Sequence, residues 1–191
     1  TPKDVIVKGS DGNFYQYLLK GHEDLRLDER IMQFFRLVNS YIMNETCFNG
    51  LLIRTTCVIP LDKLNGLVQW IPGTETLNNV VEYIRNLRHE DTQIEYKIAE
   101  KITYQGFSNL EPFQRMEVIG DIFNQVPDTD ISNFFLLKSP DLKTWLRQIQ
   151  TFSISAAMTS TIGYVIGLGD RHPSNLLIDS VSGKVVHIDF G

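Results

Sequence analysis

The sequence predicts an α+β fold made of two lobes, and three observations indicate it. Residues 1–72 are rich in strand-forming runs and contain one amphipathic helix. Pro72-Gly73 then interrupts the pattern. Residues 73–191 have mainly helical periodicity and carry one short hairpin near their end. The expected boundary is therefore the Pro-Gly break, a hinge beside a cleft, and clefts between lobes are common ligand sites.

The first lobe is expected to hold a hairpin, a helix and two more strands. Two β-rich runs within 5–20 flank a Ser-Asp-Gly-Asn turn. The aliphatic runs at 51–61 and 66–71 predict two strands joined by a turn. Over 24–43, apolar residues at helical spacing predict an amphipathic helix: Leu27, Ile31, Phe34, Phe35, Val38 and Ile42.

Helices are expected to dominate the second lobe. Thr76 is placed to cap a helix over 77–88. The runs 176–179 and 184–189 flank a turn and predict a hairpin. The stretch 148–169 has no charged residue and is long enough for a membrane span, but its serines and threonines favour a buried core helix. Further helices are expected over 92–102, 111–125 and 141–167.

Composition and charge exclude several classes of protein. The 191 residues are 42% hydrophobic and 21% charged, which is typical of a globular protein and argues against a disordered chain. The net charge of -5 offers no basic excess for nucleic-acid phosphates. Cys47 and Cys57 have neither a CxxC motif nor a nearby His, so a reducing compartment is expected, the cytoplasm or alternatively the nucleus. No transmembrane segment is expected.

The densest chemical signal is the end of the chain, GLGDRHPSNLLIDSVSGKVVHIDFG. Asp170 and Asn175 have the D-x-x-x-x-N spacing of a kinase catalytic loop, and Asp189 begins an Asp-Phe-Gly motif. Phosphoryl transfer needs an Asp that meets the attacking hydroxyl and two oxygen-bearing side chains that hold Mg²⁺. Each piece alone is usually structural, but together on one loop and hairpin they indicate function.

Two histidines flank these residues. His172 lies inside the loop, after the Asp rather than before it, and is expected to polarise the substrate hydroxyl or accept its proton. His187 precedes Ile188-Asp189 in a strand, where a histidine more often packs and forms local hydrogen bonds. We therefore assign function to His172 and a structural role to His187.

A second cluster surrounds Lys20, at the end of a predicted strand. A lysine that reaches toward phosphates and is held by a carboxylate from the next helix is a kinase device. Glu23, Asp24 and Asp28 are candidate partners; Asp28 shares the buried helix face with Ile31, so it is preferred over Glu23. The alternative is an ordinary solvated helix start.

The third feature is Trp70, which leads into the predicted hinge. A Trp at this position can form one wall of an adenine pocket, and the backbone of Ile71 can hydrogen-bond to the purine. Core packing is the alternative for any Trp, but the hinge position favours the pocket.

Taken together, these motifs resemble those of a known protein family. GLGDRHPSNLLID and HIDFG, preceded by LLKGHEDLRLDERIMQFF, resemble the phosphatidylinositol-3-kinase-related protein kinases over essentially the whole chain. The pattern looks most like the target-of-rapamycin branch, given GHEDLR, LLKSP and GDRHPSNL. LDERIMQF and the Gln before Trp70 are also similar to the nonsense-mediated-decay branch. The Asp-Arg-His order separates this family from ordinary protein kinases.

The resemblance implies a two-lobed, protein-kinase-like catalytic domain of the PI3/PI4-kinase type, truncated at both ends. The phosphate loop is expected before residue 1 and the activation loop after Gly191, so the fragment alone is expected to be inactive. The resemblance implies that Lys20 contacts the ATP phosphates and that Asp28 or Glu23 orients this lysine. It also implies adenine binding by Trp70 and Ile71, proton transfer by Asp170 with help from His172, and metal binding by Asn175 and Asp189.

The expected function is that of a serine/threonine protein kinase that uses ATP and Mg²⁺, with Mn²⁺ as an alternative metal, in growth and nutrient signalling. Three alternatives stay open: a nonsense-mediated-decay-type kinase, a phosphoinositide lipid kinase and a nucleotide-binding pseudokinase scaffold. The expected partners are protein substrates and regulatory scaffold subunits.

Overall fold

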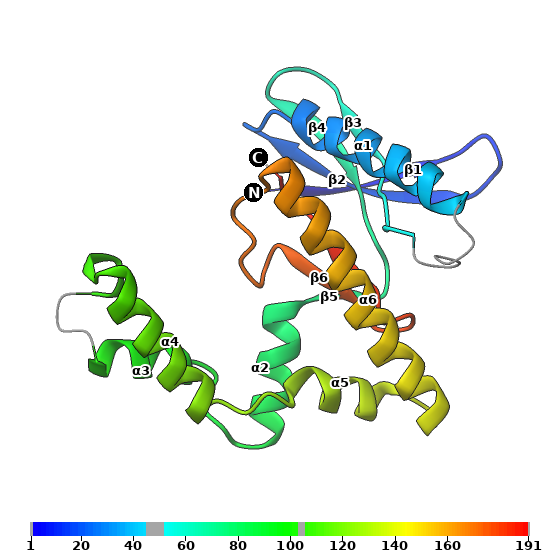
Figure 1. Ribbon diagram of the computed structural model, residues 1–191. Coiled ribbons are helices and arrows are strands. Elements are labelled where there is room, and N and C mark those ends of the chain that lie inside the picture. Colours follow the sequence, from blue (N-terminus) through cyan, green and yellow to red (C-terminus); the bar gives the residue numbers. More distant parts are fainter. Residues whose placement is uncertain (1, 45–51, 103–105, 191) are drawn as a thin grey trace.

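The computed structural model describes residues 2–44, 52–102 and 106–190. Helices and two separate sheets confirm the predicted α+β class (Figure 1). Cys47 lies outside the described residues, and Cys57 is a free, exposed thiol. Among the described residues, no helix is long and apolar enough to span a membrane.

The first sheet is antiparallel, with the strand order β1-β2-β4-β3. The helix α1 (Arg26–Met43) packs against it through the apolar stripe seen in the sequence, and Met32 and Phe35 are buried. The four strands are β1 (Lys3–Lys8), β2 (Phe14–Gly21), β3 (Val58–Pro60) and β4 (Asn65–Gln69).

The strand predicted over 51–61 is shorter than expected, because only Val58–Pro60 pairs in the sheet. Residue 51 lies outside the described residues. In the part before β3, the backbone of Ile53 bonds to a side chain instead of a strand: its N–H donates to Asn39 Oδ1 and its C=O accepts from Asn39 Nδ2, both at 2.8 Å. The aliphatic composition of this segment therefore serves packing on α1 rather than strand pairing.

The second sheet has the order β5-β6-β7 and consists of β5 (Thr74–Thr76), β6 (Leu176–Asp179) and β7 (Val185–His187). The predicted hairpin forms β6 and β7, whereas β5 was not predicted, since Thr-Glu-Thr has no apolar alternation. Around it lie α2 (Leu77–Leu87), α3 (Ile94–Ile102), the 3-10 turn η2 (Phe107–Asn109), α4 (Pro112–Gln125), α5 (Asp130–Lys138) and α6 (Leu142–Ile166).

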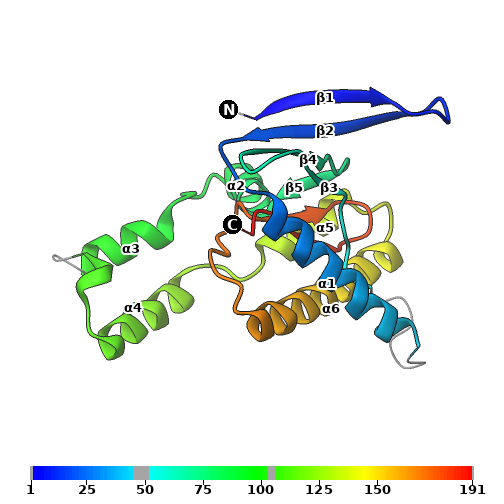
Figure 2. The ribbon, with the colours of Figure 1, turned by 90° about the horizontal axis from the view of Figure 1, so that it is seen from above.

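The predicted helices form within one or two residues of their expected ends, and Thr76 caps α2 by accepting a hydrogen bond from Asn79 N–H at 3.1 Å. The helix α5 was missed. Its consecutive Phe134 and Phe135 are both fully buried, so its apolar residues do not follow a single stripe. In both views, α3 and α4 lie side by side, away from the sheets (Figures 1 and 2).

The uncharged stretch forms most of α6, and the helix is closed at Gly167 by its positive φ of 67°. The helix contributes Met158 and Ile162 to the core beneath α1. It also packs Trp145, Ile149 and Phe152 against the core around α2 and α5. The expected core helix is thus buried on one side only, because its other face is exposed and Tyr164 is 89% accessible.

Candidate active site

A cavity of about 320 Å³ lies between the first sheet and the second. Strands β2, β3 and β4 and helix α1 line one side; β5, β6 and the segment after β7 line the other. Its volume is at the lower end of the range for small-molecule sites. Several predicted site residues line it: Lys20, Asp28, Trp70, Ile71 and Asp189.

Lys20 and Asp189 join the two sides of this cavity. Lys20 Nζ lies 2.6 Å from Asp189 Oδ1 and 3.3 Å from Glu23 Oε2. Burial alone would lower the pKa of Lys20, but the hydrogen bond and charge of Asp189 outweigh it, so its pKa is raised. Burial also raises the pKa of Asp189, but hydrogen bonds from Lys20 and Glu23 bring it below its usual value. The lysine is therefore a fixed cation facing the cavity.

The geometry favours Glu23 over Asp28 as the direct partner of Lys20, the reverse of the expected order. His22, with a φ of 65°, turns the chain after β2, and Glu23 N–H donates to Leu64 O at 3.1 Å. This turn brings Glu23 back toward Lys20. Burial, followed by a hydrogen bond with Asp189, raises the pKa of Glu23.

Asp28 does lie on the buried face of α1, as the helical spacing predicts. Its Oδ1 accepts from the backbone N–H of Phe190 at 3.4 Å, whereas its Oδ2 has no hydrogen-bond partner among the described residues. Burial raises the pKa of this carboxyl. Asp28 therefore holds the Asp-Phe-Gly backbone against α1 and keeps one buried carboxylate oxygen without a partner among the described residues.

Asn175 connects the Gly167–Asn175 loop to the segment after β7. Its Nδ2 donates to Asp170 O at 3.1 Å, and its own carbonyl accepts from Ile188 N–H at 3.1 Å. Asp170 has a φ of 49°, and its carboxylate is mostly exposed. His172 Nε2 lies 4.0 Å from Asp170 Oδ2. The loop therefore presents a free carboxylate with an imidazole beside it.

Asn175 and Asp189 offer the oxygen ligands that Mg²⁺ prefers. Because the Asn175 Nδ2 is engaged, its Oδ1 remains an acceptor beside the Asp189 segment. In the described part of the chain, no three His, Cys, Asp or Glu side chains gather as a metal site. One carboxylate and one amide fit a magnesium ion that takes its other ligands from phosphates and water.

Arg171 was not among the predicted site residues, although it stands between two of them. Its Nε donates to Gly169 O at 2.7 Å, its Nη1 to Ile188 O at 2.8 Å, and its Nη2 to Asp189 O. The guanidinium also lies over the Phe190 ring, 5.3 Å from the centroid. Arg171 therefore ties the loop to the backbone of Asp189, whose φ is 61°. The Asp-Arg-His order was the signal for it.

Trp70 and Ile71 both line the cavity where β4 leads into β5. The backbone N–H of Trp70 donates to Gln16 O at 2.9 Å, which holds the main chain at Trp70 to β2. Ile71 is buried, and its carbonyl accepts from Thr74 Oγ1 at 2.8 Å. The geometry thus places these two residues on the cavity wall, while their part in purine binding stays a prediction.

Comparison with known proteins bears on this arrangement. A family model described as "Phosphatidylinositol 3- and 4-kinase" matches residues 14–191. The chain is 39% identical over 193 residues to the target of rapamycin homolog of Caenorhabditis elegans, covering 100% of the chain and 7% of that protein. It is 40% identical over 192 residues to serine/threonine-protein kinase TOR2 of Saccharomyces cerevisiae, covering 100% of the chain and 8% of that protein.

More distant relatives share the same region. Protein kinase rad3 of Schizosaccharomyces pombe is 32% identical over 195 residues, with 99% of the chain and 8% of that protein covered. The solved FAT and kinase domain of CtTel1 superposes with a TM-score of 0.81 at 30% identity, covering 100% of the chain and 14% of that structure. The chain thus spans only 7–8% of these curated relatives. The resemblance found in the motifs, strongest to the target-of-rapamycin branch, is confirmed.

Proposed function

Because the chain belongs to the phosphatidylinositol 3- and 4-kinase family, we propose that it is the core of a serine/threonine protein kinase that transfers the γ-phosphate of ATP to protein hydroxyls. The observation that carries the proposal is the meeting of Lys20 and Asp189 at 2.6 Å across one cavity. The two residues come from opposite sides of the cleft, and Asp170 and Asn175 lie on the adjoining loop.

In this reaction the oxygen of the substrate hydroxyl bonds to the γ-phosphorus, and the bond from that phosphorus to the bridging oxygen breaks. The exposed carboxylate of Asp170 takes the hydroxyl proton. Lys20 supplies positive charge to the phosphates, oriented by Glu23. Asn175 and Asp189 would hold Mg²⁺, which supplies further charge neutralisation of the phosphates.

The cavity wall supports adenine as the base. Trp70 offers an aromatic face beside the hinge, and Met32, Val58 and Val68 supply apolar surface. A mostly apolar cavity with a few charged groups at one end suits a purine attached to phosphates. The proposal therefore places adenine near Trp70 and Ile71 and the phosphates near Lys20.

The deciding experiment uses the full-length protein that contains this chain, with transfer of labelled γ-phosphate to a protein substrate as the readout. Asp170→Asn removes the proton acceptor and should lower the rate by about 10²–10⁴-fold. Asp189→Ala removes a metal ligand and should also abolish transfer. Arg36→Met is the matched control, since Arg36 pairs with Glu29 on the outer face of α1. Wild-type activity in Asp189→Ala would refute the proposal.

The wider expectations belong to the same proposal. The names of the target-of-rapamycin relatives support protein rather than lipid substrates, and growth signalling in the cytoplasm or nucleus with regulatory subunits is proposed for the longer protein. Comparing a protein substrate with phosphoinositide vesicles separates the protein kinase from the lipid kinase. A pseudokinase scaffold would phosphorylate neither substrate. Measuring the transfer rate with Mn²⁺ in place of Mg²⁺ shows which metal ion supports the reaction.

A further inference from the structure

Side-chain contacts in the described part of the chain that bridge the two sides of the cleft include two at the cavity and a third outside it. Lys20–Asp189 and Asp28–Phe190 use residues that line the cavity. The third joins Arg54 Nη1 to Asp179 Oδ2 at 3.0 Å, and neither residue is part of the cavity wall. If nucleotide phosphates and a metal engage Lys20 and Asp189, the Arg54–Asp179 contact is left unchanged.

Asp179 is fixed on the hinge side of the cleft. Its Oδ1 accepts from Val181 N–H at 2.9 Å and Ser182 N–H at 3.1 Å, which leaves Oδ2 for Arg54. In the second sheet, Asp179 is also the register partner of Thr74, the first residue of β5. Both carboxylate oxygens are therefore committed, and the side chain is a rigid anchor.

The neighbouring Ser180 holds the hinge itself. Its N–H donates to Gly73 O at 3.0 Å and its Oγ donates to the same oxygen at 2.9 Å. Gly73 has a φ of 73°, a conformation that favours glycine, and it follows Pro72 at the break between the lobes. Asp179 thus binds Arg54, and the next residue, Ser180, binds the carbonyl of Gly73 at the hinge.

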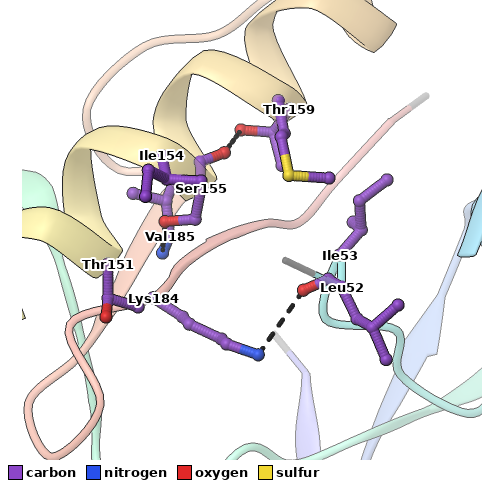
Figure 3. Close-up of a pocket in the computed structure, with 9 residues that line it drawn as sticks. Leu52, Ile53, Thr151, Ile154, Ser155, Thr159, Lys184 and Val185 are labelled. Carbon is purple, nitrogen blue, oxygen red and sulfur yellow. Dashed lines mark hydrogen bonds between the residues drawn. The ribbon is translucent and has the colours of Figure 1, made fainter. Parts of the chain in front are cut away.

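On the other side, Arg54 belongs to a segment tied to α1. The preceding residue, Ile53, makes two hydrogen bonds with Asn39 of α1. Lys184 Nζ points at the carbonyl of Leu52, 3.5 Å away (Figure 3). The cavity among Leu52, Ile53, α6 and β7 is only about 20 Å³, room for a single water molecule, so this segment is closely packed on the second lobe.

We propose that Arg54 and Asp179 form a clamp that sets the angle of α1 and the first sheet relative to the hinge. Arg54 is then a positioning residue: it does not touch nucleotide, but it fixes the side of the cleft that carries Lys20 and Asp28 against the side that carries Asp189 and Phe190. The inference rests on the proposed kinase function and adds a second point of lobe control beside the hinge.

The first test is Arg54→Met in the full-length kinase. An ion pair of this partial exposure, 37% for Arg54 and 11% for Asp179, contributes a modest free energy, so the KM for ATP should rise roughly two- to five-fold. The kcat should change less, because the reacting groups are intact. Arg54→Lys, which keeps the charge, should restore part of the affinity. The matched control is Arg36→Met, which breaks a somewhat more exposed pair, 46% for Arg36 and 23% for Glu29, within α1 alone and should leave KM unchanged.

The second variant, Asp179→Asn, changes the other residue of the ion pair. An asparagine can still accept the hydrogen bonds of the turn at Oδ1, but it loses the charge that faces Arg54. The double variant Arg54→Met/Asp179→Asn should be no weaker in ATP affinity than the worse single variant. Strictly additive effects, or an Arg54→Met enzyme with the KM of Arg36→Met, would overturn the clamp.

A second readout does not depend on activity. Ser180 N–H donates to the hinge carbonyl, so its hydrogen exchange reports whether the clamp is closed. Arg54→Met should speed exchange at Ser180 by roughly the same two- to five-fold, and Arg36→Met should not. If the wild-type protein phosphorylates no substrate, the proposed function fails but the clamp is not thereby rejected. In that case the clamp is rejected if hydrogen exchange at Ser180 is the same in Arg54→Met as in the wild type.

Discussion

His172 accepts a hydrogen bond at Nδ1 from the backbone N–H of Ser174, 3.2 Å away. In the neutral ring the proton therefore resides on Nε2, the nitrogen that lies 4.0 Å from Asp170 Oδ2. The imidazole is arranged to donate a hydrogen bond toward Asp170 or a phosphate oxygen, so this geometry favours Asp170 as the proton acceptor.

We expect His172→Ala to lower kcat by about 10²-fold, the usual loss when a donor to developing charge is removed. Asp170→Asn should lower kcat further than His172→Ala, because Asp170 and not His172 takes the proton. The measurement is kcat of the full-length enzyme for each variant. A larger loss in His172→Ala than in Asp170→Asn would assign the base to the histidine instead.

Arg171→Lys should be almost as damaging as Arg171→Met. The guanidinium donates to three carbonyls in a fixed fork, and a lysine ammonium cannot reproduce that geometry. Because one of these carbonyls belongs to Asp189, we expect a higher Mg²⁺ concentration for half-maximal activity in both variants. A magnesium titration of the lysine variant that matches wild type would contradict this role.

Gly66→Ala should destabilise the strand that carries Lys20. The two residues are partners in the β2–β4 register, and a Cβ on Gly66 would lie 2.9 Å from Ile59 O and 2.7 Å from a methyl of Leu25. Overpacking of this kind costs about 1–3 kcal/mol. Faster hydrogen exchange across β2 and β4 is the measurement.

Gly120→Ala in α4 is the control, since an added Cβ there meets no atom within 4 Å. It should stabilise α4 by about 0.5–1 kcal/mol, because alanine is the better helix former. Equal protection of β2 and β4 in Gly66→Ala and Gly120→Ala would refute the steric argument.

His187 should make the fold sensitive to mild acid. Burial, and then the charge of Arg171, lower the pKa of His187 to about 4 from 6.5. A lowered folded pKa means that the neutral form is the stabilised one, so its contribution is complete above 6.5 and is lost as the pH falls toward 4. The free energy of unfolding should drop over this window in wild type and drop less in His187→Asn. Parallel slopes for the two proteins would exclude the effect.

Local patterns predicted most of the fold because each acts within one element. The stripe that ends at Ile42, the Thr76 cap and the hairpin around 180–183 depend on neighbouring residues alone. The pairing of β5 with β6 depends on residues about a hundred positions apart, and Thr-Glu-Thr offers no pattern to reveal it.

In the candidate site, too, local sequence patterns predicted some residues, whereas others depend on contacts that only the fold creates. The motifs identified Lys20 and Asp189, and the structure shows them in contact. The choice between Glu23 and Asp28 depends on the left-handed backbone of His22, which apolar periodicity cannot register. The Asp-Arg-His order marks Arg171, but it does not reveal what the guanidinium does, because its partners are backbone carbonyls that only the fold brings together.

The helix α6 belongs to both hydrophobic cores, since Met158 and Ile162 pack beneath α1 while Trp145 and Phe152 pack against α2 and α5. Loss of packing in either core removes contacts of α6 and destabilises the helix that supports the other core. The parts of the molecule around the two cores should therefore lose their structure together, in a single cooperative unfolding transition.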